Sequence, residues 1–164
     1  INARSESAAG KPSFREAMKK RRCIIPASGF YEWEKEGTRR QPWYFLASRP
    51  GALLAIAGLW ESWRSPDGEP VETVCLLTTS ANPVLAPVHD RMPVLLDREG
   101  VESWLDPAEC DATRLTDLLV PAPAERLIGR PVSTNVNAVR NDDARNIDSI
   151  EQTEPSQGDL PFRD

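Results

Sequence analysis

Short apolar runs separated by turn residues recur along the chain. Runs rich in valine, isoleucine, leucine and aromatic residues, bounded by proline, glycine and serine, predict strands. They cover residues 23–34, as two short strands divided near Pro26 and Gly29, and residues 43–48, 53–63, 71–79, 91–96 and 129–137. The tract SPDGEP between two of these strands is typical of a hairpin turn.

A few stretches carry helical signals instead. Residues 11–22 predict a helix capped by Ser13, with Glu16 at the spacing of a capping box and cations at its C-terminal end. Residues 98–105 and 111–120 predict two further short helices.

Short strands combined with a few short helices indicate an α+β fold with a mainly antiparallel, barrel-like sheet. We expect a single domain over residues 1–150, in which residues 80–90 form a short helix or loop. Residues 151–164 are polar and hold two of the 15 prolines, so we expect a flexible tail there.

Composition is that of a soluble globular protein, with 40% apolar and 27% charged residues, and no apolar run approaches the ~20 residues that span a bilayer. The three cysteines are far apart, odd in number and outside any C-x-x-C motif, which disfavours a disulfide framework or a zinc site. We therefore expect reduced thiols in a cytoplasmic protein, without metal or cofactor.

The net charge of −5 is unevenly distributed. Residues 1–50 hold 11 Lys and Arg against 5 Asp and Glu, a net +6, whereas residues 51–164 hold 9 against 20, a net −11. Arginines make up 16 of the 20 cations, and arginine suits bidentate contacts to phosphate. The first third can thus present a basic face, although the KKRR cluster (residues 19–22) can equally be a solvated helix end.

Two titratable residues stand in apolar segments. Glu32 lies between Tyr31 and Trp33, and apolar surroundings should raise the pKa of its carboxyl toward the range useful for proton transfer. The alternative is a surface carboxylate on a half-solvated strand. His89 is the sole histidine; it is either an acid–base group or a structural ring, and Asp90 or a backbone carbonyl can fix its tautomer.

Other candidates are weaker when taken alone. Asn2 and Arg4 can belong to a site or to an ordinary terminal loop, and Arg91 can contact phosphate or form a salt bridge. The hydroxyl residues 78–80 end a strand, where site residues are frequent, or simply cap the next segment of the chain. The chain has no P-loop, dinucleotide-binding or G-x-S-x-G motif, and no cysteine has a setting that would favour a protease nucleophile.

Six segments, in order over residues 1–142, resemble the SRAP (SOS-response-associated peptidase) family: INARSES, KPSFREAMKKRRCIIPASGFYEWE, GLWESW, LLTTSAN, HDRMPVLL and PVSTNVN. The resemblance implies a protein that binds single-stranded DNA and captures abasic sites as a thiazolidine crosslink, after autoproteolytic removal of the initiator methionine. It also implies a monomer without membrane attachment, cytoplasmic and associated with the nucleoid when bound to DNA.

The resemblance assigns roles to seven residues. It implies a catalytic set of Asn2, Glu32 and His89, and a DNA-binding set of Arg4, Trp33, Thr79 and Arg91.

The family's nucleophile is an N-terminal cysteine that precedes the NAR motif, and Cys23, Cys75 and Cys110 do not match it. Because the chain begins at Ile1, we expect a native segment before it to be missing, or a truncated homologue, and we expect this chain alone not to form the crosslink. Two alternatives stay open: a non-catalytic module that binds single-stranded DNA, and a conventional peptidase.

Overall fold

The computed structural model describes residues 1–109 and 111–150. The predicted tail and Cys110 lie outside the described residues. None of the described helices is long and apolar enough to cross a membrane.

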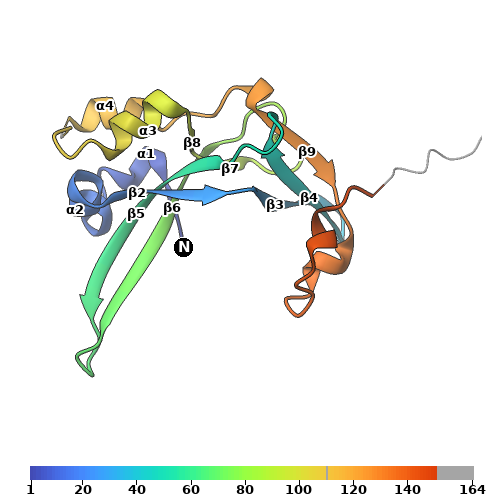
Figure 1. Ribbon diagram of the computed structural model, residues 1–164, viewed down its shortest axis with the longest axis horizontal. Coiled ribbons are helices and arrows are strands. Elements are labelled where there is room, and N and C mark those ends of the chain that lie inside the picture. Colours follow the sequence, from blue (N-terminus) through green and yellow to red (C-terminus); the bar gives the residue numbers. More distant parts are fainter. Residues whose placement is uncertain (110, 151–164) are drawn as a thin grey trace, which may run out of the picture.

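Two sheets curl into an arch (Figure 1). The larger has the order β1-β6-β5-β2, with β7 on β6 and β8 on β5; its strands are β1 (Asn2–Arg4), β2 (Arg22–Ala27), β5 (Leu54–Arg64), β6 (Pro70–Ser80), β7 (Arg91–Pro93) and β8 (Leu95–Leu96). The smaller has the order β3-β4-β9, with β3 (Gly29–Glu36), β4 (Arg39–Ala47) and β9 (Leu127–Pro131). Only the β1–β6 ladder among these is parallel. The predicted α+β fold with a mainly antiparallel, barrel-like sheet is confirmed, with the sheets curled as a half-barrel (Figure 1).

The helices gather at one end of the larger sheet, and the β5–β6 hairpin projects below that end as an arm (Figure 1). They are α1 (Ser5–Ala8), α2 (Pro12–Lys20), α3 (Arg98–Leu105) and α4 (Ala112–Asp117). Short 3-10 turns follow, namely η1 (Ala124–Arg126), η2 (Thr134–Asn137) and η3 (Ala144–Ile147), of which the last two lie at the other end of the arch.

Two apolar clusters hold these layers together. Trp104 of α3 is fully buried against the larger sheet and its indole N–H donates to the Cys23 carbonyl at 3.0 Å. The second cluster joins Phe45 of β4 to Leu85, in the loop between β6 and β7. Asn82 anchors the same loop by donating to the Ala122 carbonyl at 3.0 Å. The loop that carries His89 is therefore irregular but fixed to the core.

Several sequence predictions need correction. The first long helix starts at Pro12 and not at a Ser13 cap, because proline fits the first helical position, where no N–H bond is needed. The run at 91–96 divides into β7 and β8, and the last predicted strand stops at Pro131 and continues into a 3-10 turn. Strand β1 and helix α1 were not predicted at all.

Arg22, the last residue of the KKRR cluster, has a structural role. The Arg22 guanidinium donates to five backbone carbonyls at 2.6–3.2 Å. Those of Met18, Lys19, Trp104 and Asp106 lie at the C-terminal ends of α2 and α3, and that of Glu109 lies in the segment after α3. It also lies 5.7 Å from the Trp104 ring centroid. Arg22 thus satisfies carbonyls that helix ends leave without partners and joins the two helices.

Replacing Arg22 by alanine should lower the free energy of unfolding by about 2 kcal/mol, because several charge-assisted bonds to part-buried carbonyls are lost. That corresponds to a fall in Tm of roughly 4–8 °C for a chain of this size, measurable by circular dichroism. Lys20→Ala is the control: it removes an exposed ion pair with Glu16 and should cost about 0.5 kcal/mol or less. Equal Tm values for the two variants would contradict this structural role.

Candidate active site

One pocket of about 360 Å³ brings together residues from three separate segments of the chain. Asn2 comes from β1, Glu32 from β3, and His89 from the loop before β7. Arg4 and Arg91 also line this pocket. Five of the seven site residues implied by the resemblance therefore line one pocket.

Glu32 lies on the face of β3 that also carries Phe30, whose ring stacks on Phe45 at a centroid distance of 5.5 Å. Burial among these groups raises the pKa of the Glu32 carboxyl. The positive charge of His89 and the Trp33 backbone N–H act in the opposite direction, and the carboxylate of Asp90 adds to the rise. The result is a half-buried carboxyl that holds its proton more tightly than an exposed glutamate.

His89 has a partner for its Nδ1 atom in either protonation state. The Arg91 backbone N–H donates to Nδ1 at 3.0 Å, which favours the neutral tautomer with hydrogen on Nε2. The Arg91 carbonyl lies 3.1 Å from the same atom and the Asp90 carboxylate 3.4 Å, so a protonated Nδ1 finds acceptors there. With 38% of the side chain exposed, the ring is accessible to a bound molecule.

Asn2 is held in place by its backbone. Strand β1 pairs in parallel with β6, so that Asn2 lies opposite Leu76, and Ala3 is buried below it. The Asn2 side chain is exposed at the pocket and offers both amide donors and a carbonyl acceptor. It can therefore orient a polar group bound beside Glu32 and His89.

The two arginines differ in their surroundings. Arg4 is exposed and lines the pocket, which leaves its guanidinium accessible to an anion. Arg91 is mostly buried, with 18% of its side chain exposed, and is bound by Glu6 through two hydrogen bonds of 2.7 and 2.9 Å and by Thr78. A free phosphate would have to compete with that carboxylate.

Thr79 and Trp33 are not among the residues that line the pocket. Only 4% of Thr79 is exposed, and its neighbour Thr78 lines the pocket instead. The Trp33 indole N–H donates to Asn137 Oδ1 of η2 at 2.6 Å, beside the Tyr31 ring. The two predicted DNA contacts therefore stay predictions, with Thr78 better placed than Thr79 to meet a ligand.

Sequence reasoning missed Tyr31 and Met92 as lining residues, and it missed Glu6 altogether. Thr78 and Thr79 are adjacent on β6, and adjacent strand residues face opposite sides of a sheet. This alternation was the signal that could have distinguished the pocket residue Thr78 from the buried Thr79. Glu6 gave no comparable signal, since its partner is 85 residues away.

No group of three or more His, Cys, Asp or Glu that could hold a metal ion occurs in the part of the chain that the structure describes. Cys23 and Cys75 are free thiols on β2 and β6, and burial raises the pKa of both. Neither is therefore activated as a thiolate nucleophile.

Comparison with known proteins places this geometry in a family. The abasic site processing protein YoqW of Bacillus subtilis is 39% identical over 149 residues, which cover 91% of this chain and 66% of YoqW. The abasic site processing protein HMCES of Gallus gallus is 35% identical over 176 residues, covering 95% of this chain and 52% of HMCES. The chain thus spans about half to two thirds of these relatives.

Solved structures agree with the sequence relatives. A Bacteroides thetaiotaomicron protein superposes with a TM-score of 0.83 at 30% identity, covering 91% of this chain and 65% of that one. A Bordetella bronchiseptica protein superposes with a TM-score of 0.71 at 37% identity, covering 80% and 64%. The family model for the SOS response associated peptidase (SRAP) matches residues 1–139, and the chain therefore belongs to the SRAP family.

Proposed function

We propose that this protein processes abasic sites in single-stranded DNA by capturing the sugar aldehyde covalently. The observation that carries the proposal is the meeting of Asn2, Glu32 and His89 in one pocket, in a chain whose relatives are named abasic site processing proteins. The nucleophile would be the N-terminal cysteine that the resemblance to the SRAP family implies, supplied by the protein expressed from its whole gene, because Cys23, Cys75 and Cys110 do not match it.

The chemistry requires a base and an acid. The cysteine amine attacks the aldehyde carbon of the ring-opened sugar, the nitrogen gives up a proton, and the carbonyl oxygen becomes the hydroxyl of a carbinolamine. Loss of that hydroxyl as water gives an imine, and addition of the thiol sulfur to the imine carbon, with its proton passing to nitrogen, closes the thiazolidine. Glu32 would accept the proton from the amine, and the Nε2–H of His89 would protonate the departing oxygen.

Asn2 would hold the amine by hydrogen bonds, which lowers the entropic cost of the attack. The same three groups would activate water for removal of the initiator methionine, the autopeptidase step. An abasic sugar in a single strand has no base to unstack, so the protein need only bind the flanking phosphates and bases.

Binding to single-stranded DNA should weaken as salt rises, because cations such as Arg4 replace counterions on phosphates. With about three phosphate contacts, raising salt from about 50 to about 200 mM should weaken binding by roughly tenfold to twentyfold. Arg4→Ala should reduce the slope of log affinity against log salt by about 0.7. Fluorescence anisotropy with a labelled oligonucleotide measures both.

Arg98→Ala is the matched control, because Arg98 lies on α3 outside this pocket and 92% of its side chain is exposed. It should leave the slope unchanged. If the affinity of the protein without substitutions did not depend on salt, DNA binding through contacts between cationic side chains and phosphates would be ruled out.

Denaturing gels separate covalent capture from simple binding. The protein expressed from its whole gene should form an adduct with an abasic oligonucleotide that survives denaturation. Tight binding without any adduct would support a non-catalytic DNA-binding module instead. Mass spectrometry of the same sample should show a mature N-terminus that lacks methionine.

A further inference from the structure

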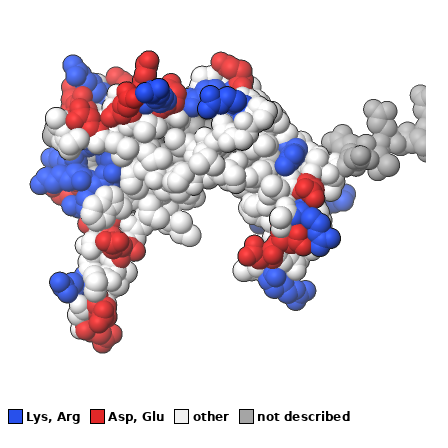
Figure 2. Space-filling model, in the orientation of Figure 1, with Lys and Arg blue, Asp and Glu red and all other residues white. Residues whose placement is uncertain are grey.

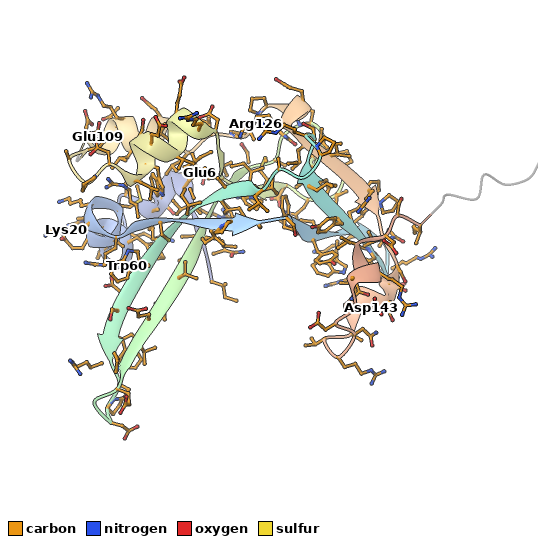
Figure 3. The ribbon with its side chains drawn as sticks, in the orientation of Figure 1. Glu6, Lys20, Trp60, Glu109, Arg126 and Asp143 are labelled. Atoms are coloured by element: carbon orange, nitrogen blue, oxygen red, sulfur yellow. The ribbon has the colours of Figure 1, made fainter. Side chains whose placement is uncertain are left out.

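Glu6 is the closest ionic partner of a pocket residue, yet it does not line the pocket itself. It follows β1 directly as the second residue of α1 (Figure 3). Its two carboxylate oxygens accept hydrogen bonds of 2.7 and 2.9 Å from the two Nη atoms of Arg91. This two-point geometry fixes both the distance and the orientation of the guanidinium.

Arg91 is bound at the same time to β6. One of its Nη atoms donates to the carbonyl and the hydroxyl of Thr78, and that hydroxyl donates to the Ala3 carbonyl of β1 at 3.3 Å. The Arg91 side chain thus ties α1, β6 and β7 together, while its backbone N–H donates to Nδ1 of His89. A continuous set of contacts runs from the segment that carries Asn2 to the ring of His89.

We propose that Glu6 is a positioning residue. By binding Arg91, it holds the segment that carries Asn2 close to His89 and keeps the His89 ring in its Nε2–H tautomer. The inference rests on the proposed function for its effect on rate. The ion pair is complete at neutral pH, because the Arg91 guanidinium holds the pKa of Glu6 below its usual range. A carboxyl whose pKa is lowered in the folded state stabilises the fold while it is ionised. This stabilisation, and the ion pair with Arg91, are therefore lost as the pH falls through the lowered pKa of Glu6.

The Glu6→Gln variant distinguishes two roles of Glu6: positioning the pocket residues, or competing with a DNA phosphate for Arg91. If Glu6 positions the site, Glu6→Gln should slow adduct formation at saturating DNA by about tenfold, because small displacements of reacting groups are costly. Affinity for single-stranded DNA should then change by less than about twofold. If Glu6 instead competes with a phosphate for Arg91, the same variant should bind DNA more tightly, and that result would overturn the proposal.

A double-mutant cycle adds a readout that general destabilisation would not reproduce. Because Glu6 acts through Arg91, the Glu6→Gln/Arg91→Met double variant should be no slower than Arg91→Met alone. Glu6→Asp, which keeps the charge, should recover part of the rate. Glu102→Gln is the matched control, since Glu102 forms an exposed pair with Arg98 at 3.2 Å and should change nothing.

The sole histidine allows a test that needs no activity. Long-range ¹H–¹⁵N spectra of the 164-residue chain should show His89 as the Nε2–H tautomer, and Glu6→Ala should shift it toward a mixture of tautomers. An unchanged imidazole spectrum would overturn the proposal. A shifted spectrum, together with a gene-encoded protein that forms no adduct, would leave the positioning role standing and remove the proposed function.

Discussion

Replacing Glu32 by glutamine should slow capture of an abasic site by about 10²–10⁴-fold, the usual contribution of a positioned general base. Glutamine has nearly the same shape and can still accept the Trp33 backbone N–H, but it cannot take a proton from the attacking amine. Affinity for single-stranded DNA should stay within about threefold, because the substitution removes no phosphate contact. The adduct yield over time on denaturing gels, at saturating DNA, gives the rate.

The pH dependence should identify the group. Burial raises the pKa of the Glu32 carboxyl, so in the unmodified protein the rate should climb as pH rises through this elevated value and the base becomes available. Glu32→Gln should lose that rising limb. Glu34→Gln is the matched control and should keep the rising limb, because Glu34 lies on the same face of the same strand but does not line the pocket. Its carboxylate accepts the Trp43 indole N–H at 2.9 Å. A wild-type rate for Glu32→Gln would end the assignment of Glu32 as the base.

The same substitution should not destabilise the fold. A carboxyl whose pKa is raised in the folded state favours folding fully only below its unfolded pKa, and this advantage is lost as pH rises through the folded value. Above the folded value the ionised Glu32 therefore lowers the free energy of unfolding, and glutamine should leave the Tm unchanged or raise it there. Lower activity without lower stability would mark a residue retained for chemistry.

Much of the fold could be predicted because most of its strands contain apolar runs with clear turn residues between them. Strands β5 and β6 and the hairpin turn that joins them follow directly from this pattern. Strand β1 could not be predicted in the same way, because its three residues carry no period and its partner β6 lies more than 70 positions away. Its pairing is nevertheless what brings Asn2 to the pocket.

The site shows the same division between local and distant information. Glu32 could be placed by strand alternation and by its apolar neighbours. Arg91 forms the salt bridge that was one of its two predicted roles, but Glu6 could not be named as the partner, since nothing local to either residue indicates the pair. Likewise the basic count of the first 50 residues includes Arg22, whose guanidinium is already bound to carbonyls at the helix ends. Charged side chains gather over the helices, over the β5–β6 hairpin and at the end of the arch that carries η2 and η3 (Figure 1, Figure 2).

Replacing His89 by alanine should slow capture by about 10²–10³-fold, because the carbinolamine would lose its proton donor for the departing hydroxyl. DNA affinity should change little, since a neutral imidazole makes no strong phosphate contact. The deletion also leaves space at a partly exposed position beside Glu32. Added imidazole should therefore enter that space and restore part of the rate, in proportion to its concentration.

Chemical rescue separates the proton-transfer role from a structural one. A ring needed only for packing would leave a misshapen pocket in its absence, and millimolar imidazole would not restore the rate. The Glu32→Gln variant is the control for this experiment, because its defect is the missing base and imidazole should not relieve it while His89 still fills its position. If His89→Ala captured abasic DNA at the wild-type rate, the ring would be structural. The acid would then have to be water or another group that lines the pocket, such as Tyr31.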